Sequence, residues 1–367
     1  MFVFAFHDPG AHNHLLPLIE HARKLGLLKR CLDLRDWWSS GATGHDLPDR
    51  IEEFRSVVLV LGCSSNRSER VLLRALRDQG IGARTVGYVE MGVSTRLDEL
   101  CARELCDTYI ATNADAQEAI RSIVYGIGCE SEVVNCGSTH FEQLRILCAG
   151  LNREAVLNCR QQAGIERHDT DSIMVSFFTA PSDESVQLEP CHVVNNLRFL
   201  LRSVADCVHS TGVQVRVLVR FHPRTSHSLA ASLKAVCAEF SGVVCDEEKV
   251  ASNLLVFQSS DLVLSLCSTV SIESIYVGSL AAFWVPEAQE DSWPRAEEFI
   301  RKNFSWRPAK DVPCLRSIVD LAAMLLQVRR AAGKMSASDV TIADDSVGAL
   351  ERAWTVLERT RMLDRAQ

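Results

Sequence analysis

Short apolar runs alternate with segments of helical spacing along the chain, and this alternation constrains the fold more than any other feature. Residues 2–6, 57–61 and 172–178 are apolar at nearly every position, rather than at every second position. A strand that is apolar on both faces needs cover on both faces, as in a parallel sheet between two layers of helices. The sequence therefore predicts an α/β fold built on doubly wound parallel sheets.

This strand–helix pattern runs twice, which predicts two Rossmann-like domains facing a central cleft. The chain of 367 residues is long enough for two domains of ordinary size. We expect the first domain over residues 1–150, the second over 165–340, and a C-terminal helix over 341–367 that can cross back to the first domain. Ligands bind beyond the carboxyl ends of parallel strands, so the residues that follow strands are the candidates for a site.

The composition narrows the class of protein. With 39 basic and 47 acidic side chains the net charge is −8, which disfavours nucleic acid as a bulk partner. The 14 cysteines form no C-x-x-C pair and many lie in apolar runs, as expected of free thiols in a reducing compartment. The chain start does not read as a secretory signal, and no apolar run reaches the ~20 residues of a membrane span. We expect a cytoplasmic protein, with peripheral contact with the inner membrane as the alternative.

A polar segment follows the first predicted strand and holds three histidines and one aspartate, within residues 7–14. We expect a loop in which Gly10 lets the backbone approach a ligand closely. Asp8, His12 and His14 are candidate general bases near neutral pH. The alternative is a helix cap and turn with solvated histidines. A metal site is disfavoured because no cluster of partner ligands is evident.

In the second half, the strand predicted at 214–221 ends in Arg220-Phe221 and is followed by His222, Pro223 and Arg224. A proline stops the strand, so the histidine can point into the cleft. We expect His222 to donate a hydrogen bond to a phosphate, with the two arginines as charge partners.

Two hydroxyl residues, Ser268 and Thr269, follow the strand predicted at 262–266 and begin a helix. Their hydroxyl and backbone N–H groups can bind a phosphate, and Glu273, one helical turn later, can accept both hydroxyls of a ribose. The alternative is simple capping, with the glutamate as a favourable first-turn charge.

Weaker candidates follow other predicted strands. Glu90 is either catalytic or a cap, and Thr179 follows the first strand of the second half. Trp37-Trp38 and residues 287–293 can line a sugar site, although core or loop packing is the simpler interpretation for the tryptophans. Asp169-Thr170-Asp171 precedes its strand, so we interpret it as a solvated linker and expect neither a metal nor a cofactor.

The motifs resemble those of the two-Rossmann-domain glycosyltransferases (GT-B) and of their relative, the UDP-N-acetylglucosamine 2-epimerase. Gly10-Ala11 with residues 14–17 is similar to the G-G-H-x-x-P loop of the peptidoglycan N-acetylglucosaminyltransferase. Residues 86–92 resemble the H-V-E-A-G stretch of the epimerases, and 260–273 resemble the donor site of both. His222-Pro223 with Ser268 and Thr269 is similar to the His-Pro and Ser/Thr motifs of bacterial sialyl- and polysialyltransferases. Residues 176–181 lack the His/Arg-rich stretch of the epimerases, which disfavours that activity.

This resemblance implies a metal-independent, inverting glycosyltransferase of surface-glycan or glycoconjugate synthesis. The donor would be a CMP- or UDP-linked sugar bound to the second domain, and the acceptor a hydroxyl of a glycan, lipid-linked or protein substrate on the side of the first. In the family the glutamate that matches Glu273 binds the ribose, and the motifs that match His222, Ser268 and Thr269 hold the donor phosphate. An epimerase or hydrolase acting on a UDP-sugar and a non-catalytic sugar-nucleotide binder are the alternatives.

Overall fold

The computed structural model describes residues 1–7, 9–35, 54–63, 68–89, 106–166, 169, 171–180, 188–246, 251–266, 268–286, 300, 312–331 and 346–365. The described residues divide into two units. Unit 1 runs to Gln143 and includes the C-terminal segment 346–365, whereas unit 2 begins at Leu144. Along the chain, helix α6 (Thr139–Ala149) passes from one unit into the other.

Unit 1 is built on one six-stranded sheet in which every paired strand is parallel. Its strand order is β2-β1-β3-β4-β5-β6. The strands are β1 (Phe2–Phe6), β2 (Leu28–Asp33), β3 (Val58–Cys63), β4 (Arg84–Val89), β5 (Thr108–Ala111) and β6 (Glu132–Asn135). Strands β1, β3 and β5 are buried at every position, as their continuous apolar sequence predicts.

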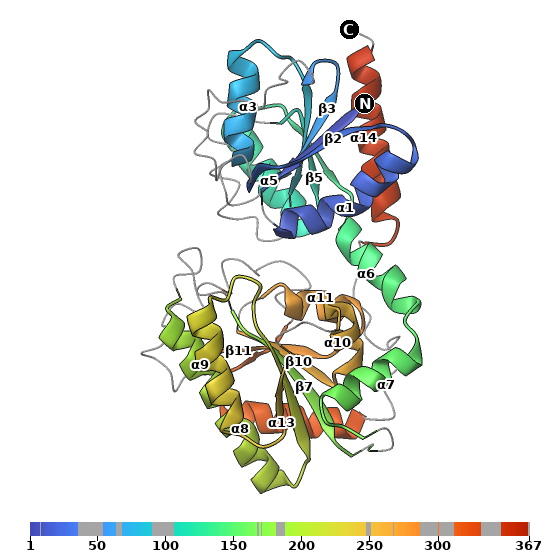
Figure 1. Cartoon of the computed structure of the whole chain (residues 1–367). Helices are drawn as coiled ribbons and strands as arrows, with labels where there is room; N and C mark the ends of the chain where they lie inside the picture. The colour runs from blue at the N-terminus through green and yellow to red at the C-terminus, as the bar shows by residue number, and fades with distance from the viewer. Residues whose placement is uncertain are drawn as a thin grey trace. The chain divides into compact units, whose positions relative to one another are not determined.

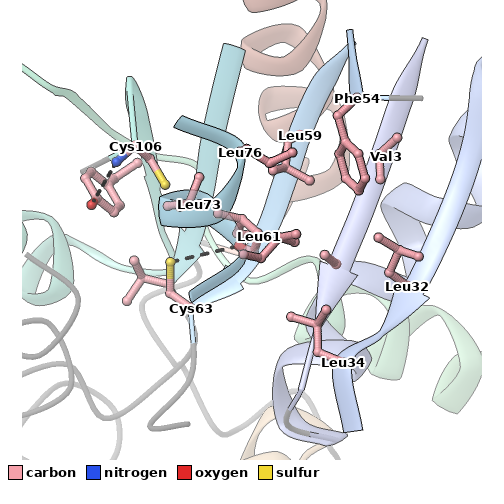
Figure 2. Close-up of a cluster of buried hydrophobic side chains, with 14 of the residues drawn as sticks. Val3, Leu32, Leu34, Phe54, Leu59, Leu61, Cys63, Leu73, Leu76 and Cys106 are labelled. Carbon is pink, nitrogen blue, oxygen red and sulfur yellow. Dashed lines mark hydrogen bonds between the residues drawn. The ribbon is translucent and has the colours of Figure 1, made fainter. Parts of the chain in front are cut away.

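Helices cover both faces of this sheet (Figure 1). Helices α1 (Pro9–Lys24) and α14 (Ala349–Arg365) pack with Phe2, Phe4 and Val60 on one face. Helices α3 (Ser68–Asp78) and α5 (Ala114–Gly126) pack on the other face. Figure 2 shows part of that second core, where Leu73 and Leu76 of α3 meet Leu59 and Leu61 of β3. The C-terminal helix thus belongs to the core of unit 1.

Helix α14 is joined to the rest of unit 1 by its first turn as well as by its apolar face. The carboxylate of Glu142 accepts hydrogen bonds from the N–H groups of Gly348 (2.6 Å) and Leu350 (2.7 Å). These N–H groups have no partner within the helix, so the carboxylate satisfies them.

Unit 2 contains a second six-stranded parallel sheet with the order β12-β11-β10-β7-β8-β9. Read from β7 outwards, this is the classical Rossmann order. The strands are β7 (Ile173–Phe178), β8 (Val215–Arg220), β9 (Val243–Cys245), β10 (Leu262–Ser265), β11 (Ala281–Trp284) and β12 (Cys314–Leu315). The predicted α/β class with two doubly wound parallel sheets is confirmed.

The helices of unit 2 also form two layers around its sheet (Figure 1). One layer holds α7 (Arg153–Gln162), α10 (Asn253–Ser259) and α11 (Val270–Tyr276). The other layer is made of α8 (Pro190–Thr211), α9 (His227–Ala238) and α13 (Ile318–Ala331).

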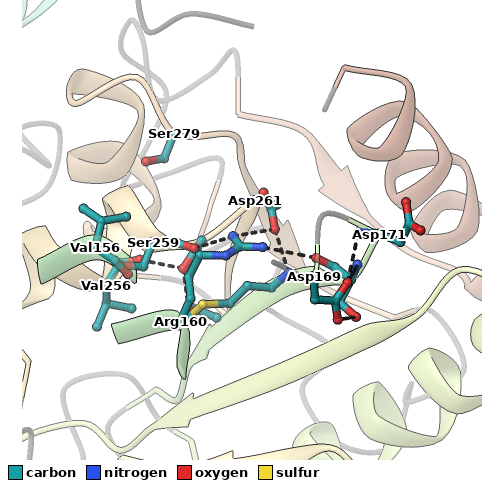
Figure 3. Close-up of polar contacts among 12 residues, drawn as sticks. Val156, Arg160, Asp169, Asp171, Val256, Ser259, Asp261 and Ser279 are labelled. Carbon is teal, nitrogen blue, oxygen red and sulfur yellow. Dashed lines mark hydrogen bonds and ion pairs between the residues drawn. The ribbon is translucent and has the colours of Figure 1, made fainter. Parts of the chain in front are cut away.

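A cluster of polar side chains stabilises this second sheet at the amino ends of β7 and β10 (Figure 3). Arg160 of α7 donates to the carboxylate of Asp261 (2.9 Å) and to the carbonyl of Ser259 (2.8 Å). The same carboxylate accepts the N–H of Met174 in β7 (2.7 Å). Asp169 accepts hydrogen bonds from the N–H and the hydroxyl of Ser172, so it caps the turn before β7. Asp169, one carboxylate of the D-x-D sequence, therefore has structural hydrogen-bond partners at the amino edge of the sheet, opposite the carboxyl ends of the strands.

The elements differ from the prediction in several places. Strands β2 and β12 were not predicted; the six residues of β2 alternate in burial and carry Lys29 and Arg30. Helix α1 begins at Pro9, so the predicted loop 7–14 is wrong in its extent. Proline suits a first helical turn, where its missing N–H would have no partner anyway.

Two further properties concern the described residues only. Their cysteines are free thiols, and half of them are buried. Within the same ranges, no helix combines the length and the apolar character that a membrane crossing needs.

Candidate functional site

In each sheet the strand order reverses at one pair of neighbours, β1 and β3 in unit 1 and β7 and β10 in unit 2. The helices that follow the two strands of each pair lie on opposite faces of the sheet. The chain therefore diverges beyond the carboxyl ends of these strands, and open α/β sheets bind ligands at such switch points.

In unit 2 the strand register brings three predicted segments to the same edge. Phe178 of β7 pairs with Ser265 of β10 on one side and with Arg220 of β8 on the other. The segments that begin at Thr179, 266 and 221 therefore leave the sheet side by side. Adjacent strands are ~4.8 Å apart, so these segments span ~10 Å along the edge.

His222 is held at this edge by its own backbone and by its ring. Its N–H donates to the hydroxyl of Thr179 (3.0 Å), and the N–H of Thr179 donates to the carbonyl of Arg220 (3.0 Å). The ring Nδ1 accepts a hydrogen bond from the N–H of Arg224 (3.1 Å). Because Nδ1 is an acceptor, a neutral imidazole carries its proton on Nε2, which makes that nitrogen a donor. Pro223 and Arg224 follow in an exposed turn.

The turn after β10 is shaped by serine hydroxyls. The buried hydroxyls of Ser265 and Ser271 are 2.7 Å apart, and Ser265 also accepts the N–H of Ser268 (3.3 Å). The hydroxyl of Ser268 accepts the N–H of Val270 (3.3 Å). Ser265 and Ser271 thus fix the turn from within, and the half-buried Ser268 precedes Thr269, the N-cap residue of the short helix.

Thr269 and Glu273 form a pair one helical turn apart on α11. The threonine side chain does not cap the helix, and its hydroxyl lies 3.5 Å from Oε1 of Glu273. Both side chains are half-buried. A hydroxyl next to a carboxylate provides a donor and acceptors for a polar ligand such as a ribose.

Arg220 is used inside unit 2. Its side chain is 2% exposed and its Nε forms an ion pair with Asp246 at 3.0 Å. Nη1 donates to Asn253 (2.9 Å) and Nη2 donates to the carbonyl of Ala251. The guanidinium therefore joins the end of β8 to the residues on either side of the segment 247–250. We leave it out of the ligand-binding set for this reason.

In unit 1, His12 lies in the first half of α1 beside the ends of β1 and β2. Its ring stacks on Phe6 with 4.3 Å between centroids. Burial lowers the pKa of His12, the nearby Asp33 carboxylate raises it in part, and Arg35 lowers it. The net effect favours the neutral imidazole, which is the form that can accept a proton. Asp33 was not predicted as a site residue, because it ends strand β2, which was not predicted either.

His14 occupies a different environment, since its side chain is 2% exposed. Its Nδ1 lies 3.1 Å from the hydroxyl of Ser138, and its ring packs against Tyr88, His140 and Phe141. Burial, and to a smaller extent His140, hold the pKa of His14 well below its ordinary value. These contacts make His14 part of the core beneath α6, and we assign it no proton transfer.

One buried carboxylate at this end of unit 1 was not singled out from the sequence. Glu69, in the first turn of α3, is fully buried and accepts the N–H of His7 at 2.9 Å. From the sequence it is an ordinary acidic residue near a helix start. Only the parallel pairing of β1 with β3 brings α3 next to the end of β1.

Several candidates lie outside the described residues, namely Asp8, Trp37, Trp38, Glu90 and residues 287–293. Gly10 lies in the first turn of α1 rather than in a loop. Possible metal ligands come together elsewhere among the described residues: atoms of Glu189, Cys191 and His192 lie within 4.8 Å of one another at the start of α8.

Comparison with known proteins shows a likeness of fold. No protein-family model matches the chain, and no curated protein matches it. The UDP-N-acetylglucosamine 2-epimerase of Neisseria meningitidis, solved with UDP-N-acetylglucosamine bound, has 10% identity and a TM-score of 0.57, with 98% of this chain and 99% of that chain covered. The wall teichoic acid polymerase TagF has 10% identity and a TM-score of 0.54, over 100% and 90% of the two chains. The UDP-N-acetylglucosamine 2-epimerase of Methanocaldococcus jannaschii, solved with UDP-N-acetylglucosamine and UDP, has 12% identity and a TM-score of 0.52, over 92% and 93%.

These similarities extend over nearly the whole chain and include both sheets. The chain therefore has the two-domain, Rossmann-like fold of GT-B type that the resemblance of its motifs implied. At 10–12% identity the likeness concerns the fold, and activity has to be argued from the side chains.

Proposed function

We propose that the chain is a glycosyltransferase that moves a sugar from a CMP- or UDP-linked donor to a hydroxyl acceptor with inversion at the anomeric carbon. The observation that carries this proposal is the constraint on His222, whose backbone is bound by Thr179 and whose Nδ1 is bound by Arg224. A ring fixed in this way presents Nε2–H as a donor without further loss of side-chain freedom. Two proteins of similar fold are epimerases solved with UDP-N-acetylglucosamine bound. A third, TagF, is named as a wall teichoic acid polymerase.

On the donor side, Nε2–H of His222 would stabilise the negative charge that develops on the departing phosphate. Ser268 and Thr269 would add hydroxyl donors from the neighbouring strand end, and Arg224 would add a positive charge from its exposed turn. Glu273 would accept hydrogen bonds from the ribose hydroxyls. Thr179 would act through His222, as the residue that positions its backbone.

On the acceptor side, we propose His12 as the base that removes the hydroxyl proton, with Asp8 as the alternative. Its lowered pKa keeps the ring neutral at physiological pH, as a proton acceptor needs. The acceptor oxygen would then attack the anomeric carbon from the face opposite the phosphate, so that the carbon–phosphate-oxygen bond breaks as the new bond forms.

We further propose that transfer needs no metal ion. Asp169, one carboxylate of the D-x-D letters, already accepts three hydrogen bonds in the turn before β7. A chelator should therefore leave the rate unchanged, whereas a rate that returns only with added Mg²⁺ or Mn²⁺ would contradict this part of the proposal.

Calorimetric titration tests the donor side directly. UDP, CMP, UDP-N-acetylglucosamine and CMP-N-acetylneuraminate are each titrated into wild type, His222→Ala and His222→Gln. Loss of a hydrogen bond to a charged group costs about 1.5–3 kcal/mol, so at least one nucleotide should bind about 10- to 100-fold more weakly to both variants.

His227→Ala is the matched control, because His227 is exposed at the start of α9, five positions along the chain. It should bind the nucleotides as wild type does. Equal affinity of wild type and the His222 variants for the best ligand would remove the phosphate role from His222.

A second candidate function is epimerisation or hydrolysis of a UDP-N-acetylhexosamine. It is favoured by the fold likeness to two UDP-N-acetylglucosamine 2-epimerases. Proton NMR of UDP-N-acetylglucosamine incubated with the protein alone separates the cases. A 2-epimer or free sugar without acceptor would indicate this function, and binding without any turnover over a panel of donors and acceptors would indicate a non-catalytic binder.

A further inference from the structure

Glu69 of α3 is a buried carboxylate in unit 1 that takes no part in the proposed donor site of unit 2. Its side chain has 0% exposed surface. Oε1 accepts the backbone N–H of His7 at 2.9 Å, and Oε2 lies 3.2 Å from the hydroxyl of Ser68. Burying a carboxylate is costly unless hydrogen bonds and favourable charge compensate, so this is an unusual side chain to find in the interior.

The hydrogen bond to His7 crosses the point where the strand order of unit 1 reverses. His7 directly follows β1, and Glu69 is in the first turn of the helix that follows β3. The two helices beyond, α1 and α3, pack on opposite faces of the sheet. Glu69 therefore links the two chain segments that diverge at the switch point, which is where open α/β sheets bind ligands.

The first turn of α3 also favours a negative charge at this place. Unpaired N–H groups give a helix N-terminus a partial positive charge, which stabilises a nearby carboxylate. Glu69 therefore lies where a helix N-terminus favours a carboxylate, and its oxygen holds the main chain of His7. The residues that follow His7 are Asp8 and, in the first turns of α1, His12.

We propose that Glu69 is a positioning residue that fixes the turn between β1 and α1, and through it the base of the acceptor side. This inference rests on the proposed transferase function. It assigns Glu69 no contact with substrate. Its carboxylate holds one backbone conformation at His7, so that the base reaches the acceptor hydroxyl in the reactive geometry.

The test compares Glu69→Ala, Glu69→Gln and the control Glu118→Ala, which alters an exposed glutamate of α5. The first readout is hydrogen–deuterium exchange at the His7 amide, which needs no activity. Loss of its acceptor should speed this exchange about tenfold in Glu69→Ala. Glu69→Gln keeps an oxygen acceptor and should restore most of the protection, and the control should match wild type.

The second readout is steady-state release of UDP or CMP from UDP-N-acetylglucosamine or CMP-N-acetylneuraminate. Misplacement by ~1 Å can cost ~100-fold in rate, so kcat of Glu69→Ala should fall about 10- to 100-fold with the donor KM unchanged. Glu69→Gln should recover most of kcat. A residue that only stabilised the fold would not separate kcat from KM in this way.

The outcomes distinguish this inference from the proposed function. Equal His7 exchange in Glu69→Ala and wild type overturns the inference, whatever the activity. Faster exchange with an unchanged kcat also overturns it, because the turn would then not matter for the reaction. A wild type that neither binds donors nor releases nucleotide overturns the transferase proposal instead.

Discussion

The guanidinium of Arg220 forms an ion pair with the carboxylate of Asp246, with 3.0 Å between Nε and Oδ2 and only 2% of the arginine side chain exposed. Its two remaining nitrogens bind Asn253 and the carbonyl of Ala251. The arginine that precedes the His-Pro pair thus holds the end of β8 to Asp246, Ala251 and Asn253. Its place in the sequence suggested a phosphate ligand instead.

Replacement of this arginine should therefore affect stability. Arg220→Met keeps the apolar stem but removes the buried guanidinium that pairs with the partly buried Asp246 carboxylate, and loss of one member of a buried ion pair typically costs about 3–5 kcal/mol of the free energy of unfolding. Urea denaturation of the full chain, followed by fluorescence, measures the loss of free energy of unfolding. Arg224→Met, at an exposed position, should cost less than about 0.5 kcal/mol. An Arg220 variant as stable as wild type that fails to bind nucleotide would restore its role as a ligand.

The buried His14 predicts a dependence of stability on pH. Its pKa is well below the ordinary 6.5 in the folded protein, so the folded state keeps the ring neutral where the unfolded chain takes up a proton. Stability should therefore fall as the pH drops below about 6.5, by at most ~1.4 kcal/mol per pH unit from this group, until the folded pKa is reached.

Urea midpoints between pH 7.5 and 5 test this dependence in wild type and His14→Gln. The variant should lose part of the slope below pH 6.5, and His209→Gln, at an exposed position of α8, should keep it. If wild type and His14→Gln have the same slope, His14 is not neutral in the folded state.

Gly62 of β3 lies where α1 crosses the sheet, and there is no room for a side chain at this position. A Cβ at this position would lie 2.8 Å from Cβ of Ala11 and 3.2 Å from Cδ1 of Leu15. Since Ala11 has no flexible end that could move away, Gly62→Ala should cost about 1–3 kcal/mol of stability through displacement of α1.

Gly82→Ala serves as the control for this prediction. It has open space around its Cβ and an ordinary backbone conformation, so it should be neutral or stabilise by up to about 1 kcal/mol. Thermal unfolding of the two variants compares them. A Gly62→Ala variant that melts with wild type would mean that α1 does not pack on β3 as closely as described.

The apolar pattern of the sequence predicted the class of the fold and most of its strands, because strands buried on both faces leave a strong signal. Strand β2 left none, since Lys29 and Arg30 interrupt it at the sheet edge. Residues 7–14 were predicted as a loop, whereas proline is favoured in the first turn of a helix, and α1 begins at Pro9.

The candidate site depends on contacts that join distant parts of the chain. The sequence singled out His222, Thr269 and Glu273, because each follows a predicted strand. Glu69 was missed because its partner His7 is 62 positions away, and only the pairing of β1 with β3 brings the two together. Burial likewise separates His14 from His12, although both are histidines of one short segment.

The central claim is that the carboxyl edge of the unit 2 sheet binds an activated sugar nucleotide. Hydrogen–deuterium exchange with and without UDP-N-acetylglucosamine or CMP-N-acetylneuraminate at saturating concentration tests it most directly. Bound nucleotide sugar should slow exchange in the segments after β7, β8 and β10, at residues 178–180, 221–226 and 266–276. Segments at the opposite edge, 212–215 and 259–262, should exchange as before. Protection confined to the opposite edge, or none in the three predicted segments with either nucleotide sugar, would contradict the account.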